Sequence, residues 1–131
     1  MGKKILIVED DVALYNMYSA ELKLKGFDVI NISDGSMAIE SIKRERPDLV
    51  LLDVMLPQKN GLQILEDLKG DDDIKGTKVV MLTNYGTDEN ISKAVELGAE
   101  DYVMKYNIVP ADLSDKVKSI LGENSDVKLV S

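Results

Sequence analysis

The feature that most restricts the fold of this chain is a short unbroken apolar run, Leu49–Leu52, which ends in the carboxylate of Asp53. Runs of this length are typical of strands buried on both faces, which occur mainly at the centre of a parallel sheet covered by helices. Pro57 follows shortly and stops further sheet pairing. Ligands of open parallel sheets bind outside the carboxyl ends of the strands. Asp53 is therefore a candidate functional residue, although aspartate is also a common turn former.

The rest of the chain alternates between strand-like and helix-like segments. We expect the other strands over residues 4–9, 27–32, 77–83 and 99–105, and helices over 12–25, 38–46, 61–69, 88–97 and 110–121. Short connections between alternating elements predict an α/β fold with right-handed crossovers. The expected architecture is a doubly wound, five-stranded parallel sheet of order 2-1-3-4-5, with five helices in a three-layer α/β/α sandwich.

Composition limits the function classes. The chain has 131 residues, which predicts one domain over 1–121, followed by a flexible tail or linker stub over 122–131. Its formal charge of -8 disfavours direct binding to nucleic acid or to anionic membranes. There is no cysteine and no histidine, which excludes thiolate chemistry and the Ser-His-Asp triad. The apolar run Ile5–Val8 is too short for a signal peptide or a membrane span, so a cytoplasmic location is expected.

Acidic residues follow two strands that the predicted order places side by side. Glu9 and Asp10 end the first strand and Asp53 ends the third, so these side chains should face one another at the topological switch point. Each close pair of such charges costs on the order of 1–4 kcal/mol unless a positive charge lies between them. A site made only of carboxylate oxygens suits Mg²⁺ or Mn²⁺.

Two further polar residues end the remaining central strands. Thr83 closes the fourth strand with a hydroxyl, and Lys105 closes the fifth with an ammonium. Either one alone is an ordinary strand or surface residue. Together with the acids they form a set suited to a phosphoryl group, because a metal and a lysine neutralise its charge and a hydroxyl donates a hydrogen bond.

From about Lys3 to Leu121, the chain resembles the receiver domain of two-component response regulators, of the chemotaxis type. The matching motifs stand at the ends of four strands: Val8-Glu9-Asp10-Asp11, Asp53-Val54-Met55-Leu56-Pro57, Leu82-Thr83, and Tyr102-Val103-Met104-Lys105.

The resemblance implies that Asp53 is the phosphoacceptor and that the cofactor is Mg²⁺ or Mn²⁺. Asp10 and Asp53 would bind the ion directly, Glu9 through a water, and the backbone carbonyl of Met55 would supply another oxygen. The absence of histidine fits this chemistry, because the phosphoryl donor is a histidine on the partner and the ionised Asp53 carboxylate needs no general base.

The resemblance also implies a switch. Thr83 and Lys105 would contact the phosphoryl oxygens, and Tyr102 matches the aromatic residue that turns inward when Thr83 moves. The face formed by the fourth helix, the fifth strand and the fifth helix would then change shape as a population shift and bind a downstream protein.

The implied partners are a sensor histidine kinase or phosphotransfer protein, the downstream protein, and a second copy in a phosphorylation-dependent dimer. Such a receiver catalyses only its own phosphorylation and dephosphorylation.

The sequence departs from the family pattern after Lys105, where Tyr106 replaces a proline that usually follows a cis bond. Either the bond is trans and Lys105 is aimed differently, or local packing holds a strained cis bond. The trans bond is favoured, because a cis bond before a residue other than proline costs about 2.5–4 kcal/mol. Tyr85, two residues after Thr83, is expected to hinder the water that hydrolyses the acyl phosphate. Met17, Met37, Met81 and Met104 are interpreted as core residues.

Two alternatives differ in class. A Mg²⁺-dependent phosphatase of the haloacid dehalogenase type would use an aspartyl-phosphate intermediate, but it needs an acid/base aspartate two residues after Asp53, where this chain has Met55. A flavin-binding flavodoxin would need a hydroxyl- and glycine-rich loop after the first strand. Glu9-Asp10-Asp11 stands there instead and would repel a phosphate.

Overall fold

The computed structural model of the chain describes residues 2–84, 88–105 and 108–122. Five parallel strands form one sheet in the order β2-β1-β3-β4-β5, which confirms the predicted topology. The elements along the chain are β1 (Lys4–Val8), α1 (Val12–Leu24), β2 (Asp28–Ile32), η1 (Gly35–Met37), α2 (Ala38–Glu45), β3 (Leu49–Asp53), α3 (Gly61–Lys69), β4 (Lys78–Thr83), α4 (Asp88–Glu96), β5 (Asp101–Met104) and α5 (Pro110–Leu121).

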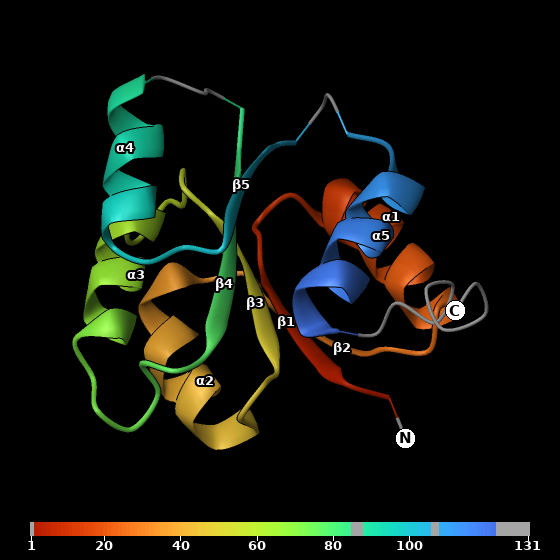
Figure 1. Cartoon of the computed structure of the whole chain (residues 1–131), viewed down its shortest axis with the longest axis horizontal. Helices are drawn as coiled ribbons and strands as arrows, with labels where there is room; N and C mark the ends of the chain where they lie inside the picture. Colours follow the sequence, from red (N-terminus) through yellow and green to blue (C-terminus); the bar gives the residue numbers. More distant parts are fainter. Residues whose placement is uncertain (1, 85–87, 106–107, 123–131) are drawn as a thin grey trace.

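Helices cover both faces of the sheet, so the molecule has three layers (Figure 1). Helices α1 and α5 lie on one side, and α2, α3 and α4 lie on the other. Each side encloses its own apolar cluster, because successive strand residues point to opposite faces. In β1, for example, Leu6 and Val8 face α2–α4, whereas Ile5 and Ile7 face α1 and α5.

The central strands β1 and β3 bring the acidic residues together. Both are almost wholly buried, as expected for strands covered on both faces. They pair in parallel, with Val8 opposite Leu52. The next residues along the two strands, Glu9 and Asp53, therefore lie at the same edge of the sheet, which is the carboxyl end of both strands.

Capping residues define the ends of the helices near the acidic residues. The side chain of Asp11 accepts a hydrogen bond from the Leu14 N–H (3.1 Å) at the start of α1, and Asn60 accepts one from the Leu62 N–H (2.7 Å) at the start of α3. Gly26 follows α1 with a φ of 95°, a conformation that favours glycine. These caps fix where the helices nearest to Asp53 and Glu9 begin.

Two details differ from the sequence-based expectation. Strand β5 begins later than residue 99, because the Ala99 N–H donates to the Ala94 carbonyl and closes the end of α4 instead. Met81 is buried as expected, but Met17 and Met37 are 43% and 42% exposed, so the interpretation of these two as core residues was wrong. None of the helices in the described part of the chain is long and apolar enough to cross a membrane.

Candidate functional site

Three carboxylates gather at the carboxyl edge of the sheet. Glu9 and Asp10 follow β1, and Asp53 ends β3 next to it. One carboxylate oxygen from each lies within 4.8 Å of those of the other two. Glu9 and Asp53 are each only 1% exposed, whereas Asp10 is exposed to solvent. The structure thus brings together the three acids that the strand order predicted to face one another.

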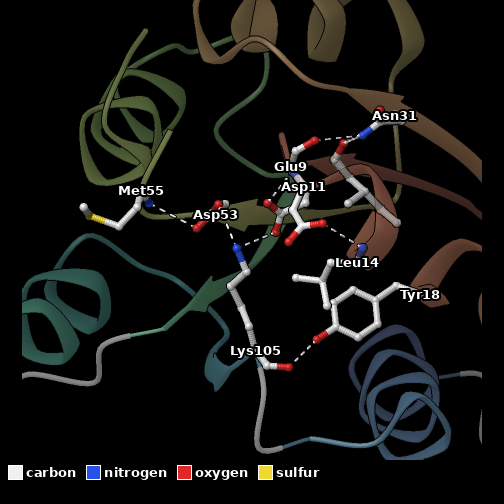
Figure 2. Close-up of polar contacts among 9 residues, drawn as sticks. Glu9, Asp11, Leu14, Tyr18, Asn31, Asp53, Met55 and Lys105 are labelled. Carbon is white, nitrogen blue, oxygen red and sulfur yellow. Dashed lines mark hydrogen bonds and ion pairs between the residues drawn. The ribbon is translucent and has the colours of Figure 1, made fainter. Parts of the chain in front are cut away.

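Lys105 provides the positive charge between two of these acids (Figure 2). Its Nζ lies 2.8 Å from Glu9 Oε1 and 3.0 Å from Asp53 Oδ2, and the residue is 5% exposed. It follows directly after β5, so it reaches across the end of β4 to arrive at Asp53. Because these ion pairs are buried, removing one partner would leave the other charge without water or a counterion. Breaking such a pair therefore costs more free energy than breaking a surface pair.

The crowding of charges changes how these groups ionise. Burial raises the pKa of Glu9 to about 7, with a further contribution from the Asp53 charge, and the hydrogen bonds from Lys105 and the Asp11 N–H only partly offset this rise. Burial alone lowers the pKa of Lys105, but its contacts with Glu9 and Asp53 outweigh burial and raise that pKa above its ordinary value. Lys105 is therefore charged at neutral pH.

Main-chain groups hold the acids in place. The Met55 N–H donates to Asp53 Oδ1 (3.1 Å), and the Asp11 N–H donates to Glu9 Oε2 (3.1 Å). Figure 2 also shows the side-chain amide of Asn31, which donates to the Glu9 carbonyl (3.3 Å). Each buried carboxylate therefore has one oxygen near a backbone N–H and the other near Lys105.

Thr83 and Tyr102 lie on the two strands beyond Asp53. Thr83 is fully buried at the end of β4, where it pairs with Met104, while Asp53 pairs with the preceding residue, Leu82. Tyr102 lies in β5 and is half-buried against the apolar cluster under α2–α4. Both are thus on the strands where the resemblance expected them.

Two residues near the site were not singled out from the sequence. Tyr18 of α1 donates its hydroxyl hydrogen to the Lys105 carbonyl (2.7 Å), and Asn31 of β2 bonds the main chain of β1. Helical spacing within residues 12–25 puts Tyr18 on the same face as Leu14 and Leu22, which indicates only an inward-facing side chain. Its hydroxyl, a polar atom on a mostly apolar helix face, is the one signal that could have marked it.

Some expectations concern parts of the chain that are not described. The role assigned to Tyr85, the trans bond between Lys105 and Tyr106, and the nature of the tail beyond Gly122 all lie outside the described residues.

The donor set fits a divalent cation. All three side chains offer oxygen, which Mg²⁺ and Mn²⁺ prefer, and the exposed Asp10 leaves one side of the cluster open to water. Two of the acids are already buried at an energetic cost that a cation would offset. The arrangement therefore brings together three carboxylates, two of them buried, and a buried lysine at one point.

Comparison with known proteins gives a consistent result. The sequence model of the family described as response regulator receiver domain matches residues 5–118. The DNA-binding response regulator MtrA of Mycolicibacterium smegmatis is 40% identical over 126 residues, which cover 96% of this chain and 54% of that protein. The chain thus spans about half the length of the curated relatives it matches.

Solved structures agree. The BeF3-activated N-terminal receiver domain of Klebsiella pneumoniae RstA is 39% identical, with a TM-score of 0.82 over 90% of this chain and 97% of that one. A CheY-like receiver domain protein from Methanospirillum hungatei is 32% identical, with a TM-score of 0.86 over 96% of this chain and 98% of that one. Sequence and structure thus lead to the same group of proteins.

Proposed function

The chain belongs to the response regulator receiver domain family and is a phosphoaccepting module of two-component signalling, and we propose that Asp53 is the residue that accepts the phosphoryl group. The observation that carries this proposal is the buried contact of the Lys105 ammonium with Asp53 Oδ2 at 3.0 Å, beside Glu9 and Asp10. Of the three clustered acids, Asp53 is the last residue of β3, whereas Glu9 and Asp10 follow β1.

In the proposed step, an ionised carboxylate oxygen of Asp53 attacks the phosphorus of a phosphohistidine on the donor protein. The new O–P bond forms as the P–N bond breaks, and the imidazole nitrogen keeps the electron pair and takes up a proton. Lys105 neutralises charge on the phosphoryl oxygens, and the Thr83 hydroxyl donates a hydrogen bond to one of them. We thus propose that the chain promotes its own phosphorylation and the later hydrolysis.

We assign the cation site to Asp10 and Asp53 as direct ligands, Glu9 through a water, and the Met55 carbonyl. A bound Mg²⁺ or Mn²⁺ supplies positive charge to the carboxylates and to the phosphoryl oxygens. The mutual approach of the three acids to within 4.8 Å supports this assignment. The Met55 N–H bond to Asp53 supports it too, because it holds the Met55 main chain beside the cluster.

Mg²⁺ is therefore expected to stabilise the folded protein. At about 100 times its dissociation constant, the ion should raise the free energy of unfolding by roughly 2.7 kcal/mol, because it binds only the folded state. Thermal unfolding at matched ionic strength measures the effect. Asp10→Asn should remove most of it without disturbing the core, since Asp10 is exposed. An equal shift in both proteins would argue against the assigned site.

Incubation with acetyl phosphate and Mg²⁺ tests the phosphoacceptor. The intact mass should rise by one phosphoryl group, the modification should map to the peptide that contains Asp53, and a chelator should prevent it. A mass that stays unchanged, or a phosphoryl group found on another residue, would contradict the proposal.

The expected partners follow from the chemistry. We propose a sensor histidine kinase or phosphotransfer protein as the donor, and a downstream protein or a second phosphorylated copy as the reader of the α4–β5–α5 face, with Tyr102 and Thr83 as switch residues. We propose a cytoplasmic location for this reaction. The relative MtrA is a DNA-binding protein about twice as long, so residues 1–121 are proposed as the receiver and 122–131 as a tail or linker stub.

The alternative of a phosphatase that turns over external substrates is not favoured. The residue two positions after Asp53 is Met55, whose side chain is 58% exposed and cannot act as an acid or base. The two buried acids, Glu9 and Asp53, instead contact Lys105 and main-chain N–H groups.

A further inference from the structure

A buried tyrosine hydroxyl contacts the main chain of the residue that carries the site's ammonium. Tyr18 of α1 is fully buried, and its Oη lies 2.7 Å from the Lys105 carbonyl oxygen, to which it donates. Figure 2 shows the ring pointing from α1 toward the end of β5, with the hydroxyl aimed at that carbonyl. The two residues are 87 positions apart in the chain, so the contact is purely tertiary.

The main chain of Lys105 is thereby held from two directions. Its N–H donates to the Thr83 carbonyl (2.8 Å), which extends the pairing of β4 and β5 by one residue, and its carbonyl accepts from Tyr18. The lysine side chain has several rotatable bonds, so the place its ammonium can reach depends on how its Cα is oriented. Both hydrogen bonds fix that orientation.

The ring of Tyr18 is itself immobilised by the core. It lies in the apolar cluster between the sheet and the helices α1 and α5, among Ile5, Ile7 and Leu22. A ring that is fully buried in a close-packed core has little freedom to move, so the Tyr18 hydroxyl stays in place when Lys105 moves. The bond also does not depend on the charges at the other end of Lys105.

We infer that Tyr18 is a positioning residue for Lys105, an inference that rests on the proposed function of Asp53. When a phosphoryl group reaches Asp53, the ammonium of Lys105 must exchange its contact with the Asp53 carboxylate for contacts with phosphoryl oxygens. The bond from Tyr18 keeps the base of the lysine in place during this exchange. Preorganisation of this kind is what allows a charged group to stabilise a transition state without first reorganising.

The test is the rate of phosphorylation of the full chain by acetyl phosphate at saturating Mg²⁺. Tyr18→Phe keeps the ring and removes only the hydroxyl, and we expect it to lower the rate constant about tenfold. Tyr15→Phe is the matched control on the same helix, because the described residues offer no hydrogen-bond partner to the Tyr15 hydroxyl. It should change the rate by less than about twofold.

A double-mutant cycle separates positioning from general destabilisation. If Tyr18 acts through Lys105, Tyr18→Phe should have less than about a twofold effect in a Lys105→Ala background. An undiminished tenfold loss in that background, or an unchanged rate in the single variant, would overturn the inference. Should Tyr18→Phe be unfolded by circular dichroism at the assay temperature, Tyr18→Leu, which also lacks the hydroxyl, is measured in the same cycle. A wild-type protein that takes up no phosphoryl group would instead contradict the function proposed for Asp53.

Discussion

Asp53→Asn is expected to lower the rate of phosphoryl uptake from acetyl phosphate by at least about a thousandfold, because it removes the nucleophile. The amide has nearly the shape of the carboxylate, so the packing around this buried residue is kept. It is neutral, however, and a poor nucleophile toward phosphorus. Intact mass over time, under conditions that fully modify the wild-type protein, measures the loss.

Two controls identify the cause of that loss. Asp72→Asn makes the same change on a side chain that is 95% exposed and far along the chain from the cluster, and it should leave the rate unchanged. Asp10→Asn weakens the proposed cation site without touching the nucleophile, so raising the Mg²⁺ concentration should restore its phosphorylation but not that of Asp53→Asn. Uptake that persists in Asp53→Asn would show that another residue accepts the phosphoryl group.

Gly61→Ala is expected to destabilise the fold by about 3 kcal/mol, because there is no room for a side chain at this position. A Cβ on Gly61 would lie 2.0 Å from the Asp53 carbonyl oxygen and 2.8 Å from Val54 Cα. The neighbours are backbone atoms, so no flexible side chain can move away. The Gly61 N–H also donates to the Val54 carbonyl (2.8 Å), which ties the start of α3 to the end of β3.

Gly76→Ala provides the comparison for this change. A Cβ at Gly76 would meet nothing within 4 Å, so this substitution should alter the free energy of unfolding by no more than about 0.5 kcal/mol. Chemical denaturation of both variants beside the wild type measures the difference. Equal stabilities for the two variants would show that the contact between α3 and β3 is looser than described.

The sequence was sufficient to predict the fold and the place of the cluster. Alternating apolar segments specify a parallel sheet, and the short run before Asp53 marks its central strand. The strand order then puts Glu9 and Asp10 beside Asp53, and the structure has all three together. These features follow from local patterns and from a topological rule, so no side-chain geometry was needed.

What the sequence could not predict depends on how the elements pack. Helical spacing indicates that Tyr18 faces inward, but the partner of its hydroxyl depends on how α1 lies against the end of β5. Gly61 was predicted only as a helix start, because its closeness to Asp53 arises from the path of the loop between β3 and α3. Met17 directly precedes Tyr18 and lies beside the buried face of α1, which is formed by Leu14, Tyr18 and Leu22. Residue type alone does not indicate which of two neighbouring apolar residues is buried.

The balance of charge at the carboxyl edge has a consequence for which molecules can enter. Among the described residues, three carboxylates and one ammonium meet there, so the formal charge is -2 when all three acids are ionised, and it is less negative at neutral pH because the pKa of Glu9 is raised to about 7. A free anion that arrives alone is repelled, whereas a divalent cation cancels the charge. We therefore expect this cluster to accept a phosphoryl donor, such as an acyl phosphate or a phosphoramidate, only when a divalent cation is bound, and inorganic anions to bind weakly when the cation is withheld.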